Sequence, residues 1–110
     1  MTEELLSKKD IYDVVIIGGG PAGLTAGIYT SRARLSSLLI EKVGIGGQAA
    51  ITDRIENYPG FIGGISGPEL VHNMGEQAKS FGMRTVFCEV TRIEVSDEST
   101  IKKIFVNDDP

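Results

Sequence analysis

The chain has 110 residues, a formal net charge of −4 at pH 7 and one cysteine. This length is enough for a single domain with a modest core. The acidic balance, with no run of basic residues longer than two, argues against nucleic acid and anionic membranes as partners. No apolar run approaches the roughly 18 residues of a membrane span. A single cysteine excludes an internal disulfide and fits a reducing cytoplasm.

The first ten residues are polar and charged, and no small-residue cleavage site follows them, so they are expected to form a tail rather than a signal peptide. Residues 11–110 are expected to form the domain. Its first strand is expected over Asp13–Ile17, because Val14–Ile17 is a continuous β-branched run of the kind found in buried parallel strands.

Directly after this strand the sequence reads Gly18-x-Gly20-x-x-Gly23, and a helix is expected over Pro21–Arg32. Gly18 allows the tight turn, Gly20 allows the backbone to approach a pyrophosphate, and Gly23 lets the helix pack closely on the sheet. A pyrophosphate at the helix N-terminus would meet free N–H groups and the positive end of the helix dipole. The strand, turn and helix together predict a dinucleotide-binding βαβ unit.

A second strand is expected over Ser37–Glu41, and Glu41 lies 18 residues after Gly23. An acidic side chain about 20 residues beyond such a glycine turn accepts a hydrogen bond from the ribose 2′-hydroxyl of a dinucleotide. The same carboxylate would repel a 2′-phosphate, so NADP is disfavoured at this site.

A long connection rich in glycine and apolar residues, Val43–Gly67, follows the second strand. A merely flexible linker would be polar, and long loops in compact domains tend to be functional. The connection is therefore expected to fold over a ligand, with a short helical turn around Ile51–Ile55. A second helix is expected from Ser66 as N-cap to a stop at Gly82, because Ser66 and Glu69 form a capping box.

The second helix has one apolar face at helical spacing, formed by Leu70, Val71, Met74, Ala78 and Phe81. The opposite face is expected to be solvated and carries His72, Glu76 and Lys79. Beyond this helix a strand is expected over Met83–Val90, with Cys88 as a buried, inert thiol within it. A hairpin is expected next, from Arg92–Val95 and Ile101–Val106.

No catalytic residue and no metal site are expected in this chain. The one cysteine and the one histidine stand at unrelated positions and supply no ligand set. A single cysteine cannot run dithiol–disulfide exchange, and no serine, histidine and aspartate have the spacing logic of a catalytic triad. Catalysis would therefore depend on a bound cofactor, with the protein supplying position and electrostatics.

Several blocks of the sequence together resemble the N-terminal FAD-binding segment of low-molecular-weight, bacterial-type thioredoxin reductases. They are the glycine fingerprint, Glu41, Gly46-Gly47-Gln48, Ile55-Glu56-Asn57-Tyr58-Pro59-Gly60-Phe61 and Ser66-Gly67-Pro68-Glu69-Leu70, and the similarity covers about residues 11 to 107. The resemblance implies an α/β fold: a Rossmann-like FAD-binding βαβ unit with a parallel sheet, a long glycine-rich loop, a second helix and a C-terminal β-hairpin. Such a chain is an incomplete FAD domain.

The resemblance also implies which residues hold the FAD. The pyrophosphate would be held by Gly18, Gly20, Pro21, Ala22 and Gly23, and the adenosine ribose by Glu41, with Lys42 beside it. Gln48 and Asn57 would reach the flavin and ribityl part, in a loop shaped by Gly46, Gly47 and Thr52, and the adenine would contact the backbone of Glu89 and Val90. Alternatively, Gln48 and Asn57 cap turns of their own loop.

Members of this family are longer and carry an NADPH-binding domain with a redox-active Cys-x-x-Cys, followed by a segment that completes the FAD domain. Residues 11–110 therefore correspond to the N-terminal part of the FAD domain, and the chain alone is expected to be inactive as a reductase. The full-length protein is expected to be a cytoplasmic homodimer that passes reducing equivalents from NADPH to thioredoxin disulfide.

Two other interpretations stay open from the sequence. Another flavin disulfide reductase or a ferredoxin–NADP reductase-like enzyme, such as the flavoprotein subunit of a peroxide-reducing system, could share this first segment. The chain could also be a short nucleotide-binding or interaction module, in which case half a FAD domain would expose a sheet edge that favours association.

Overall fold

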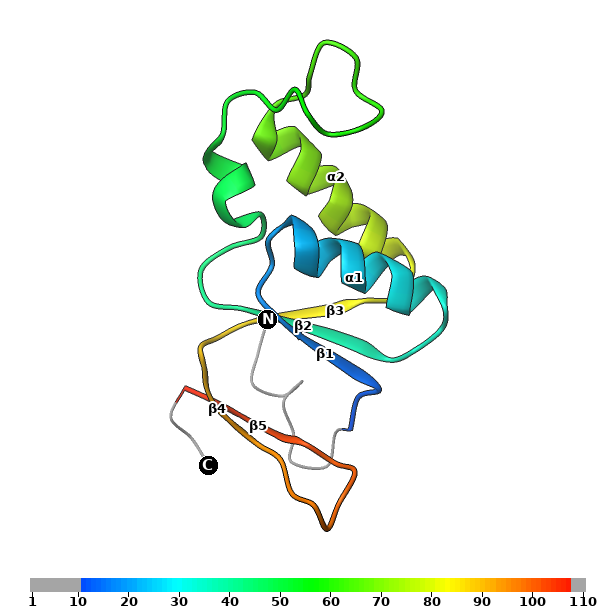
Figure 1. Cartoon of the computed structure of the whole chain (residues 1–110), viewed down its shortest axis with the longest axis vertical. Helices are drawn as coiled ribbons and strands as arrows, with labels where there is room; N and C mark the ends of the chain where they lie inside the picture. Colours follow the sequence, from blue (N-terminus) through cyan, green and yellow to red (C-terminus); the bar gives the residue numbers. More distant parts are fainter. Residues whose placement is uncertain (1–10, 108–110) are drawn as a thin grey trace.

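The computed structural model describes residues 11–107. A three-stranded parallel sheet lies between two helices on one side and a β-hairpin on the other (Figure 1). In chain order the elements are β1 (Val14–Ile17), α1 (Pro21–Arg32), β2 (Ser37–Glu41), the 3₁₀-helix η2 (Gly47–Ile51), α2 (Gly67–Ser80), β3 (Arg84–Phe87), β4 (Val90–Glu94) and β5 (Lys103–Val106). The tail predicted over residues 1–10 lies outside the described residues.

The sheet has the strand order β1-β2-β3, and both pairs of neighbours are parallel. In the register, Val15 lies opposite Leu38, and Leu38 lies opposite Arg84. β2 is the middle strand, and residues 37–40 are all buried, as expected for a strand that is covered on both faces. These observations confirm the predicted α/β class, the βαβ unit and the parallel sheet.

Apolar side chains pack on both faces of the sheet. On the helical face, Leu24 of α1 and Leu39 of β2 belong to one buried cluster with the apolar side of α2. On the opposite face, Leu38 and Val86 belong to a second cluster, against which the β4–β5 hairpin packs. No helix among residues 11–107 is long and apolar enough to cross a membrane.

α2 begins where the capping box predicts, because the Ser66 Oγ accepts the N–H of Glu69 at 3.1 Å. Its predicted apolar face is buried at Leu70, Val71, Met74 and Ala78. The prediction was wrong for Phe81, which is 41% exposed. The helix ends at Ser80 and Phe81 is its C-cap, so this side chain no longer follows the helical face.

The helical turn in the long connection lies earlier than the predicted Ile51–Ile55. The structure has it at η2, over Gly47–Ile51. Ile55 instead forms an antiparallel bridge with Ile65, with N–H···O distances of 2.7 and 2.9 Å in the two directions. This bridge requires an extended backbone at Ile55 and closes the glycine-rich part of the connection into a loop.

The strand predicted over Met83–Val90 is shorter, and the hairpin begins earlier than predicted. β3 ends at Phe87, and Val90 already belongs to β4, which pairs with β5 rather than with the sheet. Cys88 therefore lies in the connection between two strands and is half-buried, not in the middle of one strand. Its N–H donates to the backbone oxygen of Glu41 at 3.0 Å, which is the last link between this segment and β2.

Replacing Leu39 by alanine is expected to lower the free energy of unfolding by about 2–5 kcal/mol, because Leu39 is fully buried in the middle strand and truncation leaves a cavity. Urea unfolding of the purified protein measures this change through the transition midpoint. Val43→Ala is the matched control, since Val43 is 84% exposed, and its effect is expected to stay within about 0.5 kcal/mol. Equal effects of the two substitutions would contradict this packing.

Candidate functional site

The turn between β1 and α1, residues 18–23, forms the glycine turn of the site. Gly18 has a φ of +105°, a backbone conformation that favours glycine, and its N–H donates to Ile40 O at 2.9 Å. An added Cβ at Gly23 would collide with the carbonyl oxygen of Gly18. The same Cβ would lie 3.2 Å from the side chain of Ile16 in β1, so the close packing of the helix on the sheet that the sequence predicted at Gly23 is present.

The N-terminus of α1 is open to a ligand. Gly20 is the N-cap, no side chain caps the helix, and the first turn has no acidic residue. The first intrahelical bond runs from the N–H of Leu24 to Gly20 O, which leaves the amides of Ala22 and Gly23 without an acceptor in the helix. An added Cβ at Gly18 or Gly20 would meet no atom within 4 Å. The backbone here borders open space and can approach an anion.

Glu41 holds this turn from the end of β2. Its Oε1 accepts the N–H of Gly19 at 2.8 Å and its Oε2 accepts the N–H of Val43 at 2.9 Å. The hydrogen bond from Val43, followed by the one from Gly19, lowers the pKa of the Glu41 carboxyl below its ordinary value, against a smaller effect of burial. Glu41 is therefore an ionised carboxylate with acceptor capacity left for a sugar hydroxyl.

The start of the long connection lies directly on the glycine turn. The N–H of Gly46 donates to Gly19 O at 2.6 Å, and an added Cβ at Gly47 would lie 3.2 Å from the Cα of Gly20. Thr52 closes η2, because its hydroxyl donates to Gln48 O at 3.0 Å. Gly19 is a site residue that sequence reasoning missed. The run of three consecutive glycines was the available signal, since its middle member bonds to both neighbouring segments.

Gln48 and Asn57 are both exposed. Neither side chain has a hydrogen-bond partner among residues 11–107, so capping of their own loop turns is not seen. Gln48 lies in η2, next to the glycine turn, whereas the loop that carries Asn57 extends at the outer end of α2, away from the sheet (Figure 1). The structure therefore brings Gln48, but not Asn57, to the glycine turn.

Lys42 and Glu89 meet beside Glu41. Lys42 Nζ lies 3.0 Å from Glu89 Oε2 in an exposed ion pair. Both backbone groups of Glu89 are already engaged by Asn107: the Glu89 N–H donates to Asn107 Oδ1 at 3.0 Å, and the Asn107 N–H donates to Glu89 O at 2.7 Å. Val90 follows as the first residue of β4.

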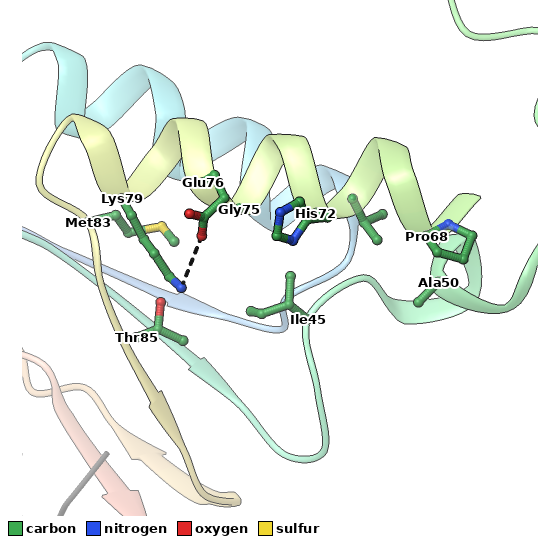
Figure 2. Close-up of a pocket in the computed structure, with 10 residues that line it drawn as sticks. Ile45, Ala50, Pro68, His72, Gly75, Glu76, Lys79, Met83 and Thr85 are labelled. Carbon is green, nitrogen blue, oxygen red and sulfur yellow. Dashed lines mark hydrogen bonds and ion pairs between the residues drawn. The ribbon is translucent and has the colours of Figure 1, made fainter. Parts of the chain in front are cut away.

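A hollow of about 240 Å³ lies between α2 and β3. Figure 2 shows apolar side chains such as Ile45 and Met83 in it, with His72, Glu76 and Lys79 along α2. These three α2 residues are exposed, as predicted, and Lys79 Nζ pairs with Glu76 Oε2 at 3.4 Å. None of the predicted cofactor residues lines this hollow, and its side chains include no nucleophile paired with a base.

Comparison with known proteins shows which family the chain belongs to. Residues 12–108 match the family described as pyridine nucleotide-disulphide oxidoreductase. The chain belongs to this family. Its curated relatives include thioredoxin reductases from Bacillus subtilis, 49% identical over 98 residues, and from Aquifex aeolicus, 43% identical over 109 residues. These matches cover 89% and 98% of this chain but 31% and 33% of the relatives, so the chain spans about a third of their length.

Solved structures of this oxidoreductase family have the same fold. The thioredoxin reductase of Lactococcus lactis superposes with a TM-score of 0.82 and 46% sequence identity, over 90% of this chain and 32% of that one. The thioredoxin reductase of T. acidophilum gives a TM-score of 0.78 at 33% identity, over 89% of this chain and 31% of that one. The resemblance to thioredoxin reductases stated from the sequence is therefore confirmed, as is the Rossmann-like fold.

Replacing Glu41 by glutamine is expected to destabilise the protein by about 1 kcal/mol at pH 7, because an amide cannot accept from both Gly19 and Val43, and solvent screening keeps the effect small. The pKa of Glu41 is lowered in the folded state, so its ionised form stabilises the fold above the ordinary value of 4.5. This contribution is lost as the pH falls below that value toward the folded-state pKa.

Urea unfolding at pH 7 and at successively lower pH values below 4.5 checks this prediction. The stability difference between wild type and Glu41→Gln is expected to shrink as the pH falls. Glu56→Gln, at an exposed carboxylate in the long loop, is the matched control and is expected to change little. A difference that stays constant over this pH range would contradict the role given to the ionised Glu41.

Proposed function

We propose that the chain is the FAD-binding portion of a thioredoxin reductase-like flavoenzyme, which passes reducing equivalents from NADPH through FAD and a dithiol to thioredoxin disulfide. The observation that carries this proposal is the ionised Glu41, joined to the glycine turn through the N–H of Gly19. A ribose acceptor and an uncapped helix N-terminus thus stand side by side, as a dinucleotide requires. The carboxylate disfavours a 2′-phosphate, which supports FAD over NADP at this position.

The described residues fit FAD in three groups. The amides of Ala22 and Gly23, with Gly18, Gly20 and Pro21, would hold the pyrophosphate. Glu41 and Lys42 would hold the adenosine ribose, and Glu89 and Val90 would lie at the adenine. The flavin and ribityl part would be reached by Gln48 and Asn57, within the loop shaped by Gly46, Gly47 and Thr52. The free amides of the helix, the open space at Gly20 and the exposed Gln48 side chain support this assignment.

FAD, when bound, accepts two electrons from a nicotinamide hydride and delivers them to a disulfide. The residues described here bind and orient the cofactor, and Glu41 keeps a negative charge at the ribose without moving a proton. The net reaction converts NADPH, a proton and a disulfide into NADP⁺ and a dithiol. These 110 residues contain one cysteine, so the dithiol would have to be supplied from elsewhere.

The partner of the complete enzyme would be thioredoxin, which is supported by the similarity of the chain to thioredoxin reductases. A homodimer in the cytoplasm is expected from the family resemblance, with residues 11–110 as the N-terminal part of each FAD domain. The single cysteine fits that reducing compartment.

Replacing Gly20 by alanine is expected to weaken FAD binding at least about tenfold while leaving the melting temperature unchanged. The added methyl group meets no atom within 4 Å, and the φ of −76° suits any residue, so the fold tolerates it. The methyl group would, however, occupy the approach to the helix N-terminus where a pyrophosphate binds.

Titration of the apoprotein with FAD, followed by flavin fluorescence, measures the dissociation constant. Gly44→Ala is the matched control, because a Cβ at Gly44 also meets no atom within 4 Å but lies outside the glycine turn. Wild-type protein that binds no FAD would refute the proposal. Equal FAD affinity of wild type and Gly20→Ala would refute the assignment of the pyrophosphate to this turn.

The enzymatic part of the proposal concerns a protein that adds a nicotinamide site and a dithiol to this segment. Such a protein is expected to oxidise NADPH only when oxidised thioredoxin is present. The 110 residues alone are expected to oxidise no NADPH. A spectrophotometric assay at 340 nm, the absorbance of reduced nicotinamide, follows the reaction. One similar structure, at 30% identity, is that of a ferredoxin-flavin thioredoxin reductase from Clostridium acetobutylicum. Thioredoxin reduction with reduced ferredoxin but not with NADPH would therefore change the assigned electron donor.

A further inference from the structure

At the end opposite its turn, the β4–β5 hairpin is held together by a reciprocal pair of hydrogen bonds between Glu89 and Asn107. The N–H of Asn107 donates to Glu89 O at 2.7 Å, and the N–H of Glu89 donates to Asn107 Oδ1 at 3.0 Å. In a regular antiparallel ladder the second bond would end on a backbone oxygen. Here the Asn107 backbone has turned out of the strand, with a φ of +52°, and its side chain replaces that oxygen. Asparagine is one of the few residues that adopt this conformation readily.

The pair determines which backbone groups are left for a ligand. Both the N–H and the C=O of Glu89 are engaged by Asn107, so Glu89 and Asn107 form a hydrogen-bonded pair. Hydrogen-bonded and non-hydrogen-bonded pairs alternate along an antiparallel ladder, and Val90 lies opposite Val106 as the next pair. The N–H and C=O of Val90 are therefore directed away from β5. The register shifts between Val90 and Arg92, so the Glu89–Asn107 pair is the hydrogen-bonded pair that adjoins Val90 on the side away from this irregularity.

Val90 also lies close to the end of β2 that carries Glu41. The N–H of Cys88 donates to Glu41 O at 3.0 Å, and Glu89 pairs with Lys42, the residue after Glu41, at 3.0 Å. The glycine turn follows β1, Glu41 ends β2, and residues 88–90 follow β3, in the spatial order β1-β2-β3. A dinucleotide that runs from the glycine turn past Glu41 along the carboxyl ends of the strands next reaches residues 88–90.

We propose that Asn107 is a positioning residue that turns the N–H and C=O of Val90 toward the adenine base of the bound dinucleotide. An adenine edge offers one ring-nitrogen acceptor and one amino donor, which a single residue's N–H and C=O complement. Asn107 holds this edge of the hairpin in register. It also engages the N–H and C=O of Glu89, so these groups do not contact the adenine. The inference rests on the proposed dinucleotide function and assigns a role to a residue outside the glycine turn and the long loop.

Two substitutions at Asn107 separate the side-chain bond from the backbone conformation. Asn107→Gly keeps the positive φ without strain and removes the acceptor, whereas Asn107→Asp keeps an acceptor oxygen at the same place. The dissociation constants of ADP and of FAD are measured for each purified protein by calorimetry, because ADP contains the adenosine end and lacks the flavin. Gln48→Ala, at the flavin end, is the contrasting variant.

Asn107→Gly is expected to raise the dissociation constants of ADP and FAD by the same factor, about fivefold to tenfold, as for the loss of one well-placed hydrogen bond. Asn107→Asp is expected to bind both within about twofold of wild type. Gln48→Ala is expected to weaken the binding of FAD and to leave the binding of ADP unchanged. This pattern supports the inference when binding is measured at a temperature where all variants are folded, because a general loss of stability would then weaken the binding of neither ligand.

ADP binding by Asn107→Gly at the wild-type level would overturn the inference and leave the FAD proposal intact. Loss of ADP binding in both Asn107 variants, in parallel with a fall in the folded fraction seen by circular dichroism, would also overturn it, since Asn107 would then serve only the fold. Wild-type protein that binds neither ADP nor FAD would overturn the inference together with the proposed function.

Discussion

Glu41 is the residue on which the arrangement of this segment depends, because it bonds to all three chain segments that leave the sheet. Its carboxylate accepts from Gly19 after β1 and from Val43 after β2, and its backbone oxygen accepts from Cys88 after β3. Because the strands are parallel, the three segments that follow them start at the same edge of the sheet, at the carboxyl ends of the strands. Only direct hydrogen bonds fix the distances between these segments. The residue proposed to hold the ribose therefore also holds the shape of the surface on which a dinucleotide would lie.

Much of the fold was predictable because its signals are local. The β-branched run Val14–Ile17 and the glycine fingerprint gave β1 and α1 to within one residue. The capping box at Ser66 gave the start of α2, since the Ser66 hydroxyl and the Glu69 amide are only three residues apart. The carboxylate at Glu41 was predicted from its spacing alone, and the structure places it on the glycine turn as that spacing requires.

Features that depend on distant partners were not predictable from local sequence. The extended backbone at Ile55 comes from its bridge to Ile65, so a helical turn was expected where none could form. The end of β3 at Phe87 follows from the pairing of Val90 with Val106, 16 positions along the chain. Asn107 closes the hairpin only because its backbone turns at a positive φ, a choice that composition does not reveal. The conformation at Ile55 and the end of β3 are thus determined by pairing with distant residues, not by propensity.

β1 borders the sheet and pairs on one side with β2, and within residues 11–107 no strand covers its other edge (Figure 1). Because translation proceeds from the N-terminus, β1 leaves the ribosome before β2 and β3. Its unpaired edge then exposes backbone N–H and C=O groups, and such an edge is a template for pairing with a neighbouring chain. The yield of folded protein in a cell is thus expected to depend on how quickly that edge is covered during synthesis, and on chaperones that shield it in the meantime.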